Sequence, residues 1–126
     1  MSGQKLQIQG HGEYSRRYLY SADAADAFDT VLHKGCIGSC YNVGSADEVT
    51  NIDVALKLLE CFGHDVKNRL EDYAEWTEDR PFNDSSYNIS DEKLKDLGWV
   101  QRTEFNIGLA KTVQWYRVYS RNWWET

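Results

Sequence analysis

The chain has 126 residues and a formal net charge of −6, with 20 acidic residues against 14 Lys and Arg. This length suits one domain that buries roughly two thirds of its unfolded surface. The acidic balance argues against a nucleic-acid partner, because no basic stripe is present to displace counterions from phosphates. Five Trp and eight Tyr exclude a disordered chain and indicate packed surfaces.

The cysteine count predicts a reducing compartment. Cys36, Cys40 and Cys61 leave an odd number, and the N-terminus lacks the basic-then-apolar pattern of a secretory signal. We therefore expect a cytoplasmic protein. No apolar run approaches the roughly 18 residues of a membrane span, so we expect no membrane partner. His33, Cys36 and Cys40 lack a fourth ligand at standard spacing, and we expect no metal.

Four segments are predicted to be extended. The first carries Leu6 and Ile8 on one face and is closed by a Gly-His-Gly turn at residues 10–12. The third is apolar enough for a buried strand, and the fourth leads into a polar loop. The segments are residues 5–9, 18–20, 40–43 and 69–76.

The clearest predicted helix begins after Tyr20. Ser21 or Asp23 can cap it, and Gly35 ends it. Apolar residues that recur at helical spacing predict the buried face of this helix. They are Ala25, Phe28, Val31 and Leu32.

Three more helices follow, and the alternation of strands and helices predicts a small α/β fold for the whole chain as one domain, residues 1–126. The last helix ends in Trp115, Trp123 and Trp124, which is more aromatic surface than a solvated helix end needs. We expect these rings to serve a core or an interface rather than a base-stacking platform. The predicted helices run from Thr50 or Asn51 to Gly63, over residues 91–97 with Trp99 packed behind, and from about Glu104 onward. The residues predicted to share the buried face of the last helix are Phe105, Leu109, Thr112, Val113 and Tyr116.

The run from Asp79 to Tyr87, with the sequence DRPFNDSSY, has the chemistry of an anion-binding loop. Arg80 offers a planar fork of donors that suits phosphate oxygens. Pro81, the only proline of the chain, restricts the backbone beside it. Asn83 can both donate and accept a hydrogen bond. A plain polar turn is the alternative interpretation of such a segment.

Five sequence blocks resemble, in order and spacing, the C-terminal half of nucleotide-sugar 4,6-dehydratases. These are extended short-chain dehydrogenase/reductase enzymes, typified by dTDP-glucose 4,6-dehydratase. The PFND variant is more similar to the UDP-glucose 4,6-dehydratase part of rhamnose synthases. The blocks are GHGEYSRRYLYSADAADAF, GCIGSCYNVGS, TNIDVALKLLECFG, DRPFNDSSYNISDEKLKDLGW and FNIGLAKTVQWY.

The resemblance implies a set of substrate-binding residues. Arg80, with Arg16 or Arg17, would contact the nucleotide-sugar pyrophosphate, and the spacing from the preceding glycines favours Arg16. Asn42 and Asn83 would be further substrate-site residues. Two guanidiniums suit a dianionic pyrophosphate because each can bind in a bidentate manner.

Each assignment has a structural alternative. Arg16 or Arg17 can be a solvated surface cation, and Asn42 can end its strand by bonding local backbone. Asp84 can cap the turn rather than orient Arg80. Asp23 and Asp79 are expected to be structural.

The sequence also departs from the family pattern. Ser86 precedes Tyr87 where the family generally has an arginine. The chain holds no glycine-rich dinucleotide fingerprint and no Tyr-x-x-x-Lys pair. We therefore assign it no catalytic and no cofactor-binding residues, although the resemblance implies NAD for the full enzymes, and we expect no dehydratase activity in isolation.

Two functional hypotheses follow. In the first, the chain is the substrate-binding lobe of a dTDP- or UDP-glucose 4,6-dehydratase of nucleotide-sugar and rhamnose metabolism. It is then either a piece of a longer chain or a fragment that must pair with a separately encoded NAD-binding half. In the second, it is a truncated, non-catalytic domain that binds nucleotide sugars or forms oligomers. The expected partners are thus a nucleotide-diphosphate sugar and either an NAD-binding half or a second copy of the chain.

Overall fold

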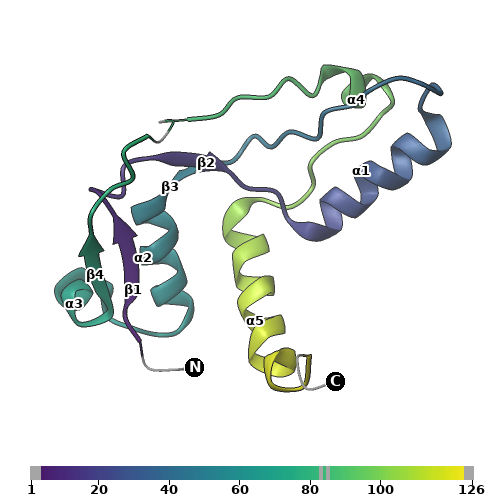
Figure 1. Ribbon diagram of the computed structural model, residues 1–126. Helices are drawn as coiled ribbons and strands as arrows, with labels where there is room; N and C mark the ends of the chain where they lie inside the picture. Colours follow the sequence, from purple (N-terminus) through teal and green to yellow (C-terminus); the bar gives the residue numbers. More distant parts are fainter. Residues whose placement is uncertain (1–3, 83, 85, 124–126) are drawn as a thin grey trace.

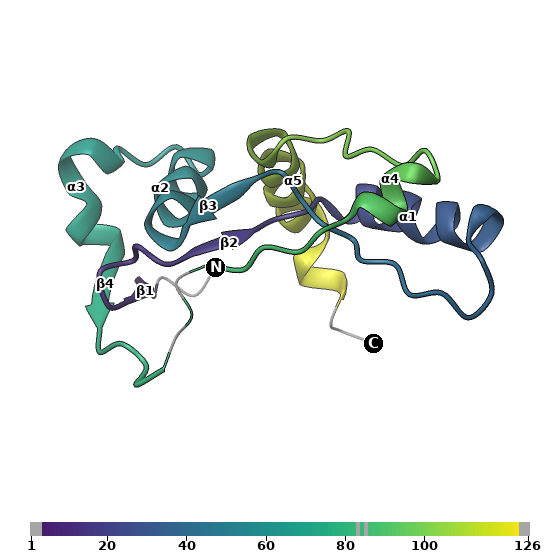
Figure 2. The same ribbon diagram turned by 90° about the horizontal axis from the view of Figure 1, so that it is seen from above.

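The computed structural model describes residues 4–82, 84 and 86–123, and its fold is the predicted small α/β arrangement (Figure 1). The molecule is elongated. One end holds α2, α3 and a strand pair, the other holds α1 and α4, and α5 lies between them (Figures 1 and 2). The elements are β1 (Leu6–Gln9), β2 (Ser15–Arg17), α1 (Ser21–Lys34), β3 (Glu48–Thr50), α2 (Asn51–Cys61), α3 (Val66–Tyr73), β4 (Ala74–Thr77), α4 (Glu92–Asp96) and α5 (Phe105–Trp123).

The four strands form two separate pairs. β1 and β4 are parallel, with Leu6 opposite Ala74. β2 and β3 are antiparallel, with Arg17 opposite Glu48. A parallel pair needs a long crossover, and α1, α2 and α3 all lie within the chain between β1 and β4.

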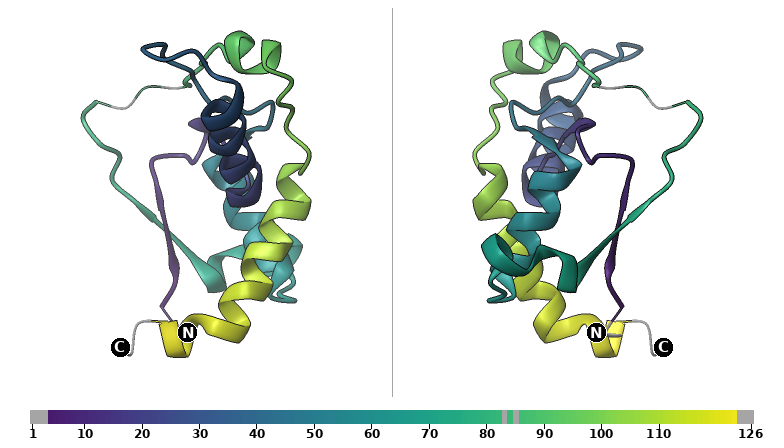
Figure 3. Two further views of the ribbon diagram at one scale, coloured as in Figure 1. Left: turned by 90° about the vertical axis from the view of Figure 1, so that its right-hand side faces the viewer. Right: turned by 90° about the vertical axis from the view of Figure 1, so that its left-hand side faces the viewer.

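The first core cluster lies under α2. Ile8 of β1, Ala55 of α2 and Ala74 of β4 are buried together. α2 begins where the sequence predicts, because the Thr50 hydroxyl accepts a hydrogen bond from the Asp53 backbone N–H at 3.2 Å. α2 lies between β1 and α5, as the end-on views of Figure 3 show.

The second core cluster lies at the other end, where Ala27, Leu94 and Trp99 are buried together. The prediction that Trp99 packs behind α4 is confirmed. Its indole Nε1–H donates to the Asp23 carbonyl at 3.2 Å. The buried Asp23 carboxylate accepts two bonds from Thr103, one from its backbone N–H at 2.8 Å and one from its hydroxyl at 3.1 Å. Asp23 is therefore structural, as expected.

α1 differs from its prediction in both its cap and its buried face. Its N-cap residue is Tyr20, with no side-chain cap bond, so neither Ser21 nor Asp23 caps it. The predicted apolar face is wrong in its main members: Phe28 is 71% exposed and Leu32 80%. The reason is that Asp23 bonds to the segment after Trp99 and turns the other side of α1 toward the core.

Three predicted extended segments also need correction. Residues 18–20 do not form a strand, since the pairing lies at residues 15–17. Residues 69–76 are mostly α3, and the strand starts only at residue 74. Residues 40–43 do not form a strand, because no other strand pairs with them among the described residues. A strand needs a neighbour that completes its hydrogen bonds.

The bounds of the last two helices match their predictions. α4 lies inside the predicted range and is followed by Gly98 at a φ of +92°, which a glycine adopts without strain. α5 starts at Phe105, and Val113 is buried on the predicted face. Thr112 and Tyr116, predicted on that same face, are exposed. The Trp123 side chain and Trp124 lie outside the described residues. None of the described helices has the length and apolar character needed to cross a bilayer.

Candidate functional site

Arg16 of β2 and the loop that follows β4 meet at one place. The Arg16 guanidinium donates through Nη1 to its neighbour's carbonyl, that of Ser15, at 2.6 Å, and to the Asp84 carbonyl at 3.0 Å. Its central carbon lies 4.9 Å from the centre of the Tyr87 ring, a cation–π contact. A single arginine on a strand therefore holds two residues of the predicted anion loop.

Tyr87 is the centre of this cluster. Its hydroxyl donates to the Asp84 carboxylate, and this bond raises the pKa of Tyr87 above its ordinary value. Arg16 and Arg80 act in the opposite direction on the pKa of the same phenol. Arg16 is thus the predicted pyrophosphate ligand that contacts this ring, and Arg80 lies earlier in the same loop.

Asp84 connects two neighbours of the loop. Its carboxylate accepts from the Tyr87 hydroxyl, and its backbone carbonyl accepts from Arg16. Asp84 thus joins Tyr87 to Arg16.

Asp79 fixes the start of the loop. Its carboxylate accepts from the Arg80 backbone N–H at 2.8 Å. It also hydrogen-bonds Tyr14 and thereby raises the pKa of that phenol. A Cβ at Gly10 would come within 2.9 Å of the Asp79 carboxyl carbon, so the turn after β1 and the loop are packed closely. Asp79 is structural, as expected, and the Arg80 side chain is exposed.

Arg17 has a different role from Arg16. Its Nη2 pairs with the Glu48 carboxylate at 3.0 Å, and its Nη1 donates to the Ser45 carbonyl at 2.9 Å. Arg17 therefore belongs to the scaffold, whereas Arg16 reaches the loop. This division agrees with the sequence argument that favours Arg16 as the substrate ligand.

The two predicted asparagines lie differently. Asn42 is exposed, and its side-chain amide donates to the Ser90 carbonyl at 3.0 Å. It bonds a distant segment, three residues beyond Tyr87, and not its local backbone. Asn83 lies outside the described residues, so the structure does not place it.

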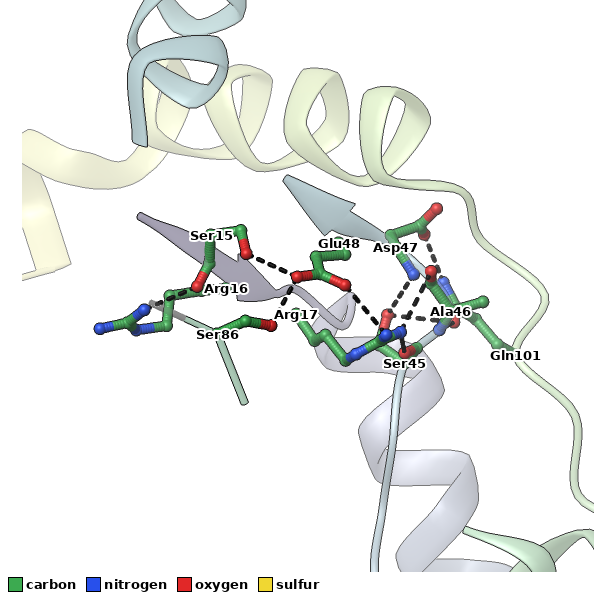
Figure 4. A network of polar contacts seen from close by, with 9 residues as sticks. All are labelled: Ser15, Arg16, Arg17, Ser45, Ala46, Asp47, Glu48, Ser86 and Gln101. Carbon is green, nitrogen blue, oxygen red and sulfur yellow. Dashed lines mark hydrogen bonds and ion pairs between the residues drawn. The ribbon is translucent and has the colours of Figure 1, made fainter. Parts of the chain in front are cut away.

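A polar network supports this cluster, and the sequence reasoning missed it (Figure 4). The Glu48 carboxylate accepts from the Ser15 and Ser86 hydroxyls, each at 2.5 Å, and pairs with Arg17. These bonds, Ser15 first and Ser86 second, lower the pKa of Glu48. Only the register that places Glu48 opposite Arg17 could have revealed it, because no spacing motif marks it.

Comparison with known proteins shows which proteins the chain is similar to. No family model matches it. It is 47% identical, over 98% of its length, to the trifunctional UDP-glucose 4,6-dehydratase/UDP-4-keto-6-deoxy-D-glucose 3,5-epimerase/UDP-4-keto-L-rhamnose-reductase of Arabidopsis thaliana. It is 35% identical, over 94% of its length, to the human dTDP-D-glucose 4,6-dehydratase. The structure of a dTDP-glucose 4,6-dehydratase from Streptomyces venezuelae with NAD and TYD bound covers 98% of this chain at a TM-score of 0.83 and 31% identity.

In sequence and in fold, the chain matches the C-terminal part of nucleotide-sugar 4,6-dehydratases. The predicted resemblance to the C-terminal part of these extended short-chain dehydrogenase/reductase enzymes is confirmed. The chain spans 18% of the Arabidopsis protein, 34% of the human enzyme and 37% of the Streptomyces chain.

The described residues also line two open clefts away from the loop. One, of about 520 Å³, lies between the start of α1 and α5 and is lined by aromatic rings, among them Tyr20, Phe105 and Trp115. The other, of about 590 Å³, lies beside Lys57 and Gln101. Neither cleft is lined by Arg16 or Arg80.

Proposed function

We propose that this dehydratase segment binds the diphosphate of a nucleotide sugar through Arg16 and Arg80, as the substrate-binding lobe of a UDP- or dTDP-glucose 4,6-dehydratase. The observation that carries the proposal is that Arg16 of β2 contacts the Tyr87 ring and the Asp84 carbonyl, and so attaches the loop that carries Arg80 to β2. The Streptomyces relative, solved with NAD and TYD, supports the ligand class.

The chemistry of the cluster suits a diphosphate. Guanidinium groups bind phosphate oxygens as planar forks and stay charged at any physiological pH. The Tyr87 ring beneath Arg16 and the Asp84 carbonyl beside it restrict this guanidinium before the ligand arrives. A ligand group that is already oriented costs less ordering entropy on binding. Asn42 and Asn83 remain proposed further contacts on the segments beside the loop.

We also propose that these 126 residues do not catalyse dehydration by themselves. The resemblance implies that the full enzymes oxidise the sugar at C4, remove water across C5 and C6, and return hydride to C6 with NAD. The residues present do not form a dinucleotide fingerprint. Gly12 is explained instead by close packing, because a Cβ there would come within 3.0 Å of Ile52.

The outer face of α1 supports an NAD-binding half as the partner. Phe28 and Leu32 are exposed there, and residues 40–43 run without a ladder among the described residues. An apolar helix face and an unpaired extended segment are what a complementary half would cover. The alternative, a non-catalytic domain that forms oligomers, is favoured by the exposed aromatic rings of α5, Trp115, Tyr116 and Tyr119.

Calorimetry with UDP-glucose and dTDP-glucose tests the binding proposal. We expect Arg16→Ala and Arg80→Ala each to weaken binding about tenfold or more, since each removes a charge-assisted contact of about 1.4 kcal/mol or more. The matched control is Arg102→Ala, an exposed arginine that pairs with Asp26 at 3.6 Å. Equal affinity of Arg80→Ala and the parent chain for both sugars would remove the diphosphate site.

Size-exclusion chromatography separates the two partner hypotheses. A stable dimer of the isolated chain that Trp115→Ser and Tyr119→Ser convert to a monomer would favour the oligomer. Turnover of UDP-glucose that appears only when an NAD-binding half is added would favour the lobe. Turnover by the 126 residues with NAD alone would contradict the proposed inactivity.

A further inference from the structure

Glu48 lies where three segments of the chain meet. It is the first residue of β3, and its cross-strand partner is Arg17. Side chains two residues apart on a strand share a face, and directly opposite residues face each other. Glu48 therefore lies on the same face as Arg17 and Ser15, and this gathering follows from the strand register alone.

The Glu48 carboxylate also reaches a third segment. One oxygen, Oε1, accepts from both the Ser15 hydroxyl and the Ser86 hydroxyl, each at 2.5 Å, while Oε2 pairs with Arg17 at 3.0 Å (Figure 4). Ser86 belongs to the loop, 38 residues further along the chain. The carboxylate thus connects β2, β3 and the loop.

Ser86 stands directly before Tyr87, the ring that contacts Arg16. The described residues of this loop, from 80 to 90, have no helix or strand to hold them. Fixing such a segment costs about 1–2 kcal/mol of backbone entropy for each ordered residue. The Arg16 contacts with Asp84 and Tyr87 and the Ser86 bond are separate attachments of the same part of the loop.

Charge explains why a glutamate suits this position. An ionised carboxylate only accepts, so one oxygen can take two hydroxyl donors in charge-assisted bonds. A glutamate is already ionised at neutral pH, and the two hydroxyls lower the pKa of Glu48 below its ordinary value. Arg17, itself held by the Ser45 carbonyl, balances the negative charge so that it does not repel a nearby anion.

We propose that Glu48 is a positioning residue of the nucleotide-sugar site: its carboxylate holds Ser86, and with it the adjacent Tyr87, on β2, so that Arg16 and Arg80 face the same diphosphate. This inference rests on the proposed function for its ligand. The attachment of the loop does not, and it can be measured without any ligand.

The first measurement is backbone hydrogen exchange of the ligand-free 126-residue chain. We expect Ser86→Ala to raise exchange in residues 84–90 at least severalfold and to leave α2 unchanged. Ser86→Thr keeps the hydroxyl and should restore protection. Ser90→Ala, in the same segment but outside the network, is the matched control. Glu48→Ala should raise exchange in the same way. Because Glu48→Ala also removes a residue of the β2–β3 pair, the proposal is judged on Ser86→Ala, which leaves that pair intact.

The second measurement is calorimetric titration of the same variants with UDP-glucose. We expect Ser86→Ala to weaken binding about threefold to tenfold without changing the melting temperature by more than 1–2 °C, and Ser86→Thr to recover the affinity. A purely structural role would not give this combination.

The outcomes separate the two proposals. Unchanged exchange in Ser86→Ala would overturn the attachment of the loop. Raised exchange with unchanged UDP-glucose affinity, in a chain that loses affinity on Arg80→Ala, would overturn the positioning role alone. A parent chain that binds neither UDP-glucose nor dTDP-glucose would overturn the proposed function and this role with it, whatever the exchange shows.

Discussion

The two ends of the molecule differ in whether their extended segments are paired. At one end, β1 and β4 form a parallel pair that α2 covers, and Ile8 and Ala74 are buried beneath it. At the other end, residues 40–43 have comparable apolar content but pair with no strand among the described residues. The difference is the neighbour and not the sequence pattern, because a strand's hydrogen bonds are completed only by another strand.

The two faces of α1 repeat this contrast within one helix. The inner face is closed, since Ala27 is fully buried against Trp99 and Asp23 bonds the segment beyond it. The outer face is open, with Phe28 and Leu32 exposed. A helix that is apolar on both faces is typical of an element buried on both sides. The outer face of α1 is therefore an exposed apolar surface of the kind that a partner covers.

The largest expected effect is the loss of stability on removal of the Trp99 ring, which packs against the inner face of α1. Trp99→Ala should destabilise the chain by about 3–5 kcal/mol, because it removes a buried ring and leaves a cavity beside Leu94. Urea denaturation measures this change. The matched control is Trp76→Ala in β4, where the ring is 51% exposed and we expect a loss below about 1–2 kcal/mol. Equal losses in the two variants would show that Trp99 does not close this end.

Much of the β1–β4 end and of the inner face of α1 was predictable from the sequence. The Gly-His-Gly turn after β1, the Thr50 cap of α2 and the packing of Trp99 behind α4 depend on local chemistry, and all three are confirmed. Local rules succeed there because the elements and their partners are both inside the chain.

The errors lie where a distant contact decides the structure. Spacing placed Phe28 and Leu32 in the core, but Asp23 turns α1 the other way through residues 80 positions further on. Helix periodicity cannot choose between two apolar faces. The candidate site shows the same division: residue chemistry pointed to Arg16 and Arg80, whereas Glu48 becomes visible only from the strand register.

The open face gives the second, smaller effect. Replacing Phe28 and Leu32 together by Ser should change the stability of the isolated chain by no more than about 0.5 kcal/mol per site, because neither side chain is buried. If the face serves an NAD-binding half, the same double variant should lose most of its association with that half in a pull-down. A double variant that unfolds would show that the face is already covered within this chain. Retained association would move the partner surface elsewhere.

The smallest expected effect is a change in the pKa of Glu48, the residue that binds the loop through Ser86. The pKa of Glu48 is lowered in the folded chain from its ordinary value of 4.5, chiefly by Ser15 and then by Ser86. A lowered pKa means that the carboxylate is the form favoured by the folded chain, so the attachment is complete above pH 4.5 and is lost as the pH falls through the lowered value.

A carbon-13 titration of the Glu48 carboxyl should give a midpoint below 4.5. In Ser86→Ala the midpoint should rise toward 4.5, since one donor is gone, whereas Ser90→Ala should leave it unchanged. An identical midpoint in Ser86→Ala and the parent chain would mean that the loop hydroxyl does not reach Glu48 in solution, and that Arg16 alone joins the loop to β2.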